Sequence, residues 1–140
     1  HGELGLQKDM QKAVKLWTEA AVLGSDGAHF NLGNAYYHGK DGVEQDMAKA
    51  IQFWGKAAMR GHVEGRHNLG IIEGEKGNWD RAARHLLISA KVGYKASVER
   101  IKQMYMGGLT TKGQYTEALK GYQDAAEEMK SHDRDEAKKL

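Results

Sequence analysis

The chain repeats itself at an interval of 37 residues, and this repetition constrains the fold more than any other feature of the sequence. A shift of 37 positions superimposes aromatic, small and asparagine residues that chance rarely aligns. The matched pairs include His1/His38, Gly5/Gly42, Asp9/Asp46, Trp17/Trp54, Gly24/Gly61, Asn31/Asn68 and Leu32/Leu69. A period of about 20 to 50 residues marks proteins whose units bury their apolar faces against one another. The sequence therefore predicts a stack of similar units.

The repetition continues along the chain with altered spacing. Ala50 recurs as Ala82 after 32 residues, and Ala82 recurs as Ala118 after 36 residues. The third unit departs from the pattern, because Arg100-Ile101 stands where a Leu-Gly pair is expected. Its first helix is therefore expected to pack less regularly than those before it.

Each unit is expected to consist of two helices. The first covers residues 28–38 and places Ala28, Leu32 and Tyr36 four residues apart on one stripe. The second covers residues 47–60 and has an apolar stripe of the same helical period. Such spacing is typical of amphipathic helices that bury one face.

The glycines of the repeats have two different predicted roles. Gly39 and Gly61 fall where the helices should end, and glycine adopts a left-handed conformation there at little cost. Gly33, Gly55 and Gly70 lie inside predicted helices, where glycine costs about 1 kcal/mol relative to alanine. That cost suggests that the backbone of one helix packs closely on its neighbour.

The spacing of these residues resembles a complete Sel1-like repeat of the tetratricopeptide class. The pattern runs Ala28-x3-Leu32-Gly33-x2-Tyr36-x2-Gly39-x2-Gly42-Val43-x2-Asp46-x2-Lys49-Ala50-x3-Trp54-x2-Ala57-Ala58-x2-Gly61. The resemblance implies an all-α fold: an α/α right-handed superhelical solenoid of antiparallel helix pairs without a β-sheet. It also implies that the repeats serve as an adaptor surface in protein complexes, with the first helices lining a concave groove.

We expect one solenoid domain over residues 1–140. Its units are a partial unit (1–24), a complete unit (25–61), a short tetratricopeptide-like unit (62–93), a divergent unit (94–130) and a charged helical tail (131–140). The partial unit holds only the loop and the second helix of a repeat. Its helix, from Asp9 to Gly24, lacks a partner helix, so the exposed end units are candidates for homodimer formation.

The side of the first helices opposite their core stripe is the candidate partner-binding surface. Its expected residues are Phe30, Asn34, Tyr37, His38, His67, Ile71, Glu75, Val98, Lys102 and Tyr105. Aromatic residues gathered on one surface suit a protein interface, where they are enriched. A groove of this kind accepts a peptide or a helix. The alternative is that these aromatic residues pack within or between the repeats.

The charge balance argues against nucleic acid as the partner. The chain has 21 Lys and Arg against 19 Asp and Glu, a formal net charge of +2. Binding to nucleic acid usually needs a concentrated basic face. An RNA-binding helical repeat nevertheless stays an alternative, because pentatricopeptide units have a similar period. No apolar stretch approaches the roughly 18 residues of a membrane span, so no membrane partner is expected.

The sequence offers no catalytic or metal-binding motif, so no enzyme activity, cofactor or metal is expected. The carboxylates are scattered at helical surface spacing, and the seven histidines form no HExxH motif. The segment 107–113 is glycine-rich but lacks the order of a phosphate-binding loop. A second alternative is a domain that recruits substrate for a larger enzyme. Cysteine is absent, which fits a reducing compartment and favours a cytoplasmic location.

Overall fold

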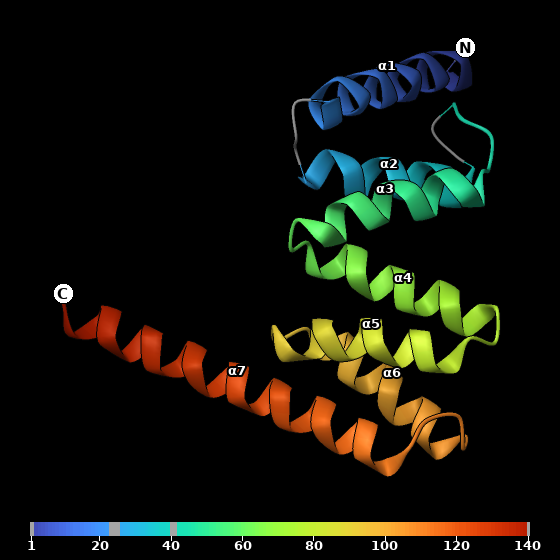
Figure 1. Ribbon diagram of the computed structural model, residues 1–140. Helices are drawn as coiled ribbons and strands as arrows, with labels where there is room; N and C mark the ends of the chain where they lie inside the picture. Colours follow the sequence, from blue (N-terminus) through green and yellow to red (C-terminus); the bar gives the residue numbers. More distant parts are fainter. Residues whose placement is uncertain (1, 23–25, 40–41, 140) are drawn as a thin grey trace. The chain divides into compact units, whose positions relative to one another are not determined.

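The computed structural model of the protein describes residues 2–22, 26–39 and 42–139. These residues form helices only, with no strand among them (Figure 1). The helices are α1 (Gly2–Val22), α2 (Asp26–His38), α3 (Met47–Met59), α4 (Val63–Glu75), α5 (Trp79–Lys91), α6 (Lys95–Met106) and α7 (Lys112–Lys138). The expected all-α fold of paired helices is confirmed. The chain divides into two compact units, His1–Gly65 and Arg66–Leu140, which are described separately.

The first unit is built around the antiparallel pair α2 and α3, with α1 packed on α2 (Figure 1). The buried Ala28 and Leu32 of α2 form the centre of its core. Trp17 of α1 and Phe53 of α3 pack against them from the neighbouring helices. The start of α3 is fixed by Asp46, whose carboxylate accepts a hydrogen bond of 3.1 Å from the backbone N–H of Lys49.

The first helix differs from the sequence-based expectation. A loop was expected before a helix that begins at Asp9, whereas α1 is helical from Gly2 onward. The corresponding loop before α3 is held to the preceding helix, because Gly39 and Asp46 donate their N–H groups to carbonyls of α2. The expected end of α1 at Gly24 lies outside the described residues.

The second unit packs α5, α6 and α7 together, with part of α4 beside them. Its core is a continuous cluster of small and aliphatic side chains contributed by these three helices. The buried members are Ala82, Ala83, Leu86, Ala90, Val98, Ile101, Met104 and Ala118. The partly buried Ile71 of α4 packs against the same cluster.

Two of the three helix-interior glycines mark close helix packing. A Cβ on Gly33 would collide with the indole ring of Trp54, and one on Gly70 would lie 2.8 Å from Cγ of Leu86. The close packing expected at both positions is therefore confirmed. The same expectation is wrong for Gly55, since no neighbouring atom lies within 4 Å of the place where its Cβ would be.

The length of α7 follows from a missing glycine. Gly61 and Gly93 follow α3 and α5 with φ angles of +90° and +103°. Met129 stands 36 residues after Gly93, at the same distance that separates Ala82 from Ala118. A methionine does not favour the left-handed conformation, so α7 continues to Lys138 with its final turns exposed.

Candidate partner-binding surface

In the first unit, Phe30 is held by contacts within the repeat. Its ring lies 4.6 Å from the ring of His62, measured between centroids. The indole N–H of Trp54 donates a hydrogen bond of 3.2 Å to the backbone carbonyl of Phe30. This bond is possible because Gly33 leaves room for the indole on the surface of α2. Phe30 is half-buried as a result and presents only part of its ring to a partner.

The other expected residues of α2 differ in exposure. The ring of Tyr37 lies 5.2 Å from that of Trp54 and 5.0 Å from that of His38. Tyr37 and Asn34 are half-buried, whereas His38 is exposed. The internal packing of aromatic residues, which the sequence left open, thus accounts for part of the surfaces of Phe30 and Tyr37. His38 and Asn34 keep polar groups at the surface of α2.

In the second unit, His67 belongs to a half-buried polar cluster. Its Nδ1 lies 2.7 Å from the Ser97 hydroxyl, and its ring lies 5.1 Å from the ring of Tyr94. Burial lowers the pKa of His67 below its ordinary value, and the nearby Arg100 guanidinium lowers it further. The imidazole is therefore biased toward its neutral form and joins α4 to α6.

A similar histidine joins α4 to α5. Nδ1 of His85 lies 3.5 Å from an Nη atom of Arg66. Burial lowers the pKa of His85, Arg66 lowers it too, and the Glu73 carboxylate acts in the opposite direction.

The assignment of Val98 to an exposed face requires correction. Val98 is 7% exposed and belongs to the core of the second unit. The buried Ile101, not Arg100, corresponds to Leu69. The alignment of α6, the first helix of the predicted repeat 94–130, is therefore shifted by one position. The residues equivalent to His67 and Ile71 are then Glu99 and Gln103, which are both exposed. A search for an apolar residue rather than a Leu-Gly pair would have found this alignment.

The remaining expected residues lie on α4 and α6. Ile71 is half-buried against the core, and Tyr105 is half-buried with its ring stacked on Tyr115 at 5.5 Å between centroids. Glu75 and Lys102 are exposed. The most accessible parts of the predicted face are therefore charged and polar, with aromatic and aliphatic groups partly visible between them.

The described part of the chain holds no group of three His, Cys, Asp or Glu side chains placed to bind a metal ion. Its helices include none long and apolar enough to cross a membrane. A shallow hollow lies between the turn before α5 and the turn before α7, where Trp79, Arg81 and Leu109 line its walls.

Comparison with known proteins finds a resemblance to Sel1 repeats. The Sel1 repeat family model matches residues 1–25 and 27–62. The chain resembles a protective antigen of uropathogenic Escherichia coli strains that displays an SLR fold, with 29% identity and a TM-score of 0.70, over 86% of this chain and 27% of that one. It also resembles a Sel1 repeat protein from Oxalobacter formigenes, with 26% identity and a TM-score of 0.68, over 84% of this chain and 50% of the other. The chain thus spans half or less of these proteins. No curated protein matches it significantly.

Proposed function

We propose that this chain, which matches the Sel1 repeat model over residues 1–25 and 27–62 and resembles solved Sel1-type repeat proteins in its fold, is a non-enzymatic module that binds a peptide or helix of a partner protein. Sel1 repeats typically mediate protein–protein interactions. The observation that carries the proposal is the pattern of exposure along the first helices. Each offers polar side chains beside partly exposed apolar ones, and interfaces combine these two kinds of group.

In each unit a few side chains of the first helices would contact the partner. In the first unit these are Asn34 and His38 of α2, beside the visible edge of Tyr37. In the second unit they are Ile71 of α4 and the exposed Lys102 of α6, which stands beside Gln103, the residue equivalent to Ile71. Bound segments of this type are anchored by apolar side chains and oriented by charged ones.

A selection of random twelve-residue peptides displayed on phage against the immobilised chain tests this proposal. Peptides that are enriched would then be titrated against the variants His38→Ala and Lys102→Glu. Because both residues are exposed, the variants should fold normally and should weaken binding at least about fivefold where the side chain contacts the peptide. Lys138→Glu at the end of α7 is the matched control.

Two results would contradict the proposal. One is a selection that enriches no peptide. The other is an affinity that the control variant lowers as much as the two test variants do, since this would point to general charge attraction.

Recruitment of a substrate to a larger enzyme is the second candidate, and it too would use a protein-binding face. It is favoured by one observation: the similar solved proteins are longer than this chain, which covers 27% and 50% of them.

Homodimer formation through α1 is a further proposal. The exposed Leu16 of α1 is its testable element, because Leu16→Glu should abolish any concentration-dependent increase in mass seen by analytical ultracentrifugation.

A further inference from the structure

Gly121 on α7 stands at a position that α3 and α5 fill with a ring. It lies three residues after the buried Ala118. Phe53 lies three residues after the buried Ala50 of α3, and His85 lies three residues after the buried Ala82 of α5. Phe53 stacks on Tyr36 with 5.8 Å between ring centroids. Because Gly121 has no side chain, the stem of Lys91 at the end of α5 packs directly on α7 there, and a hollow of about 300 Å³ lies beside this contact.

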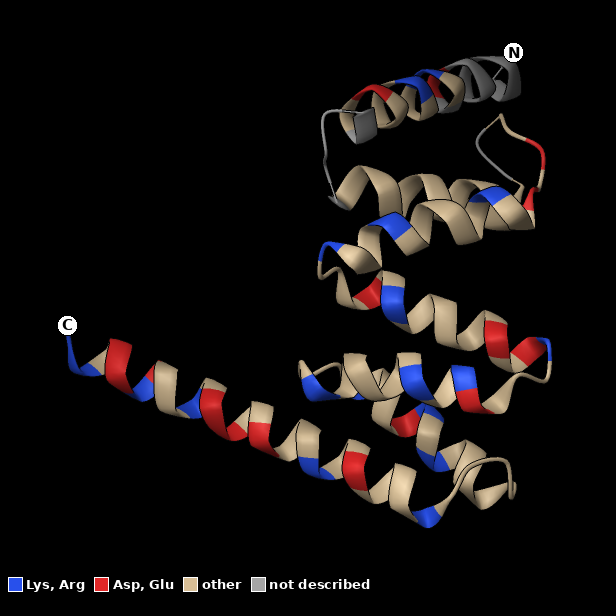
Figure 2. Cartoon of the chain, viewed as in Figure 1, with Lys and Arg blue, Asp and Glu red and all other residues tan. Residues whose placement is uncertain are grey.

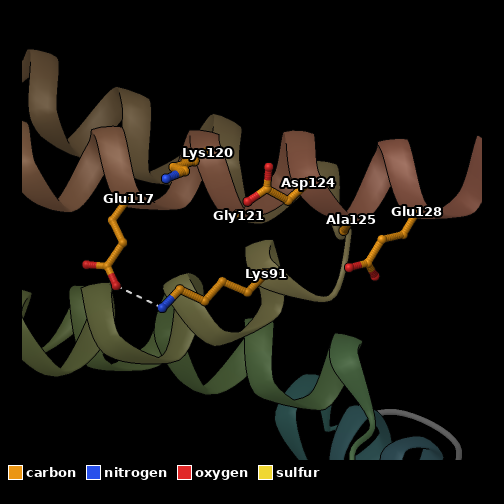
Figure 3. A pocket seen from close by; sticks show the side chains of 7 residues that line it. All are labelled: Lys91, Glu117, Lys120, Gly121, Asp124, Ala125 and Glu128. Carbon is orange, nitrogen blue, oxygen red and sulfur yellow. Dashed lines mark hydrogen bonds and ion pairs between the residues drawn. The ribbon is translucent and has the colours of Figure 1, made fainter.

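The floor of the hollow is small and apolar (Figure 3). The aliphatic stem of Lys91 crosses it, since a Cβ on Gly121 would lie 2.6 Å from Cγ of Lys91. Ala125 contributes a methyl group one turn further along α7. Such a floor can accept methylene groups of a guest side chain.

The rim of the hollow has the opposite charge from the same face of α3. Three carboxylates of α7 replace three cations of α3. The pairs, in order along the helices, are Glu117/Lys49, Asp124/Lys56 and Glu128/Arg60. This reversal is confined to one face of one helix, so the net charge of the chain conceals it.

Two of the three carboxylates are available for a partner. Nζ of Lys91 lies 2.8 Å from Oε1 of Glu117, so these two charges neutralise each other. Asp124 and Glu128 make no ion pair with any described residue. Lys120 is the remaining cation of the described lining, which leaves an excess of negative charge at the rim. The last carbonyls of α5, the negative end of its helix dipole, lie at the same place.

We propose that this hollow binds an arginine side chain of a partner peptide. A guanidinium group is planar and forked and can contact two carboxylates, here those of Asp124 and Glu128, one helical turn apart. Its methylene stem would lie on the floor formed by the aliphatic stem of Lys91 and the methyl group of Ala125. This site is separate from the face of the first helices, so either proposal can fail without the other.

Titration of the ¹⁵N-labelled full chain with N-acetyl-arginine amide, followed by NMR, tests the proposal. The expected result is a saturable shift of the amide signals of residues 121–129 and of the last turn of α5. N-acetyl-citrulline amide has nearly the same shape without the charge and should bind at least about fivefold more weakly.

The variant Asp124→Asn/Glu128→Gln should weaken binding of the arginine amide at least about fivefold, because it removes both uncommitted carboxylates. Both residues are exposed, so the fold should be unaffected. Glu127→Gln is the matched control, as Glu127 is a neighbouring carboxylate outside the lining. Equal binding by the double variant, or shifts spread evenly over the acidic residues of α7, would overturn the proposal. So would shifts of the same signals on concentrating the protein alone, since a second copy would then occupy the hollow.

Discussion

At the scale of single residues, the contact between Gly33 and Trp54 holds α2 against α3. The indole ring occupies the space above Gly33 and donates a hydrogen bond to the carbonyl of Phe30. Gly33→Ala should therefore displace a tryptophan that is 3% exposed and lower the free energy of unfolding by about 1–3 kcal/mol. Urea denaturation followed by tryptophan fluorescence and circular dichroism measures this change.

The matched control is Gly55→Ala in α3. No atom lies within 4 Å of the added methyl group, so only the gain in helix propensity remains, and stability should rise by up to about 1 kcal/mol. A destabilisation equal to that of Gly33→Ala would mean that both glycines serve the same purpose, against the contacts described here.

The two half-buried histidines of the second unit make its stability depend on pH. His67 faces Arg100, Tyr94 and Ser97, and His85 faces Arg66 and Glu73. The pKa values of both histidines are lowered in the folded state, so the unfolded chain binds more protons at mildly acidic pH.

Stability should consequently be greatest above the ordinary histidine pKa of about 6.5 and decrease as pH falls through the lowered values. Chemical denaturation at several pH values between about 8 and 5 would show this. The variant His67→Gln/His85→Gln should flatten the profile in that window. An unchanged slope in the variant would assign the pH dependence to other groups.

At the scale of helices, the sequence predicted the bounds of α2 and α3 to within about two residues. Each of these helices has an apolar stripe of helical period and is followed by a glycine, Gly39 or Gly61. The prediction placed the first helix of the third unit one position away, since the pattern sought a leucine beside a glycine and the chain offers Ile101 beside Lys102. Packing decided the alignment, because Ile101 is the residue that the core buries. The hollow at Gly121 escaped prediction because it depends on how closely the end of α5 approaches α7, which the repeat pattern does not specify.

The length of α7 depends on Met129, which is 63% exposed and makes little contribution to the core. Met129→Gly should restore a helix stop at the position of Gly61 and Gly93, at a cost of about 1 kcal/mol in local helix stability. Hydrogen exchange of residues 130–138 should become faster, with residues 112–125 unaffected. Met129→Ala preserves helix propensity and is the control; faster exchange in both variants would show that the exposed turns fray regardless of residue 129.

At the scale of the whole molecule, the distribution of charge decides which class of partner the chain can hold. Acidic and basic side chains alternate along α7, and acidic side chains lie near the basic ones on α4 and α5 (Figure 2). Binding of a nucleic acid, whose phosphates are all negatively charged, needs a continuous track of basic side chains. Binding of a peptide needs only local complementarity of charge, such as the acidic rim around Gly121 offers to a basic side chain.

Single-stranded RNA provides the test of this argument, because its phosphates would meet carboxylates wherever they met lysines. A labelled twelve-nucleotide RNA should show no saturable binding up to about 100 µM protein at about 150 mM salt, and only weak binding at low salt. Fluorescence anisotropy over a range of salt concentrations measures both values. Submicromolar binding that weakens steeply with salt would require several lysines and arginines to converge on one track, and the RNA-binding alternative would then replace the protein-binding one. The 21 cations and 19 anions of the chain exclude a continuous basic track only where they are interspersed. The net charge of +2 does not report this arrangement, whereas the salt dependence of RNA binding does.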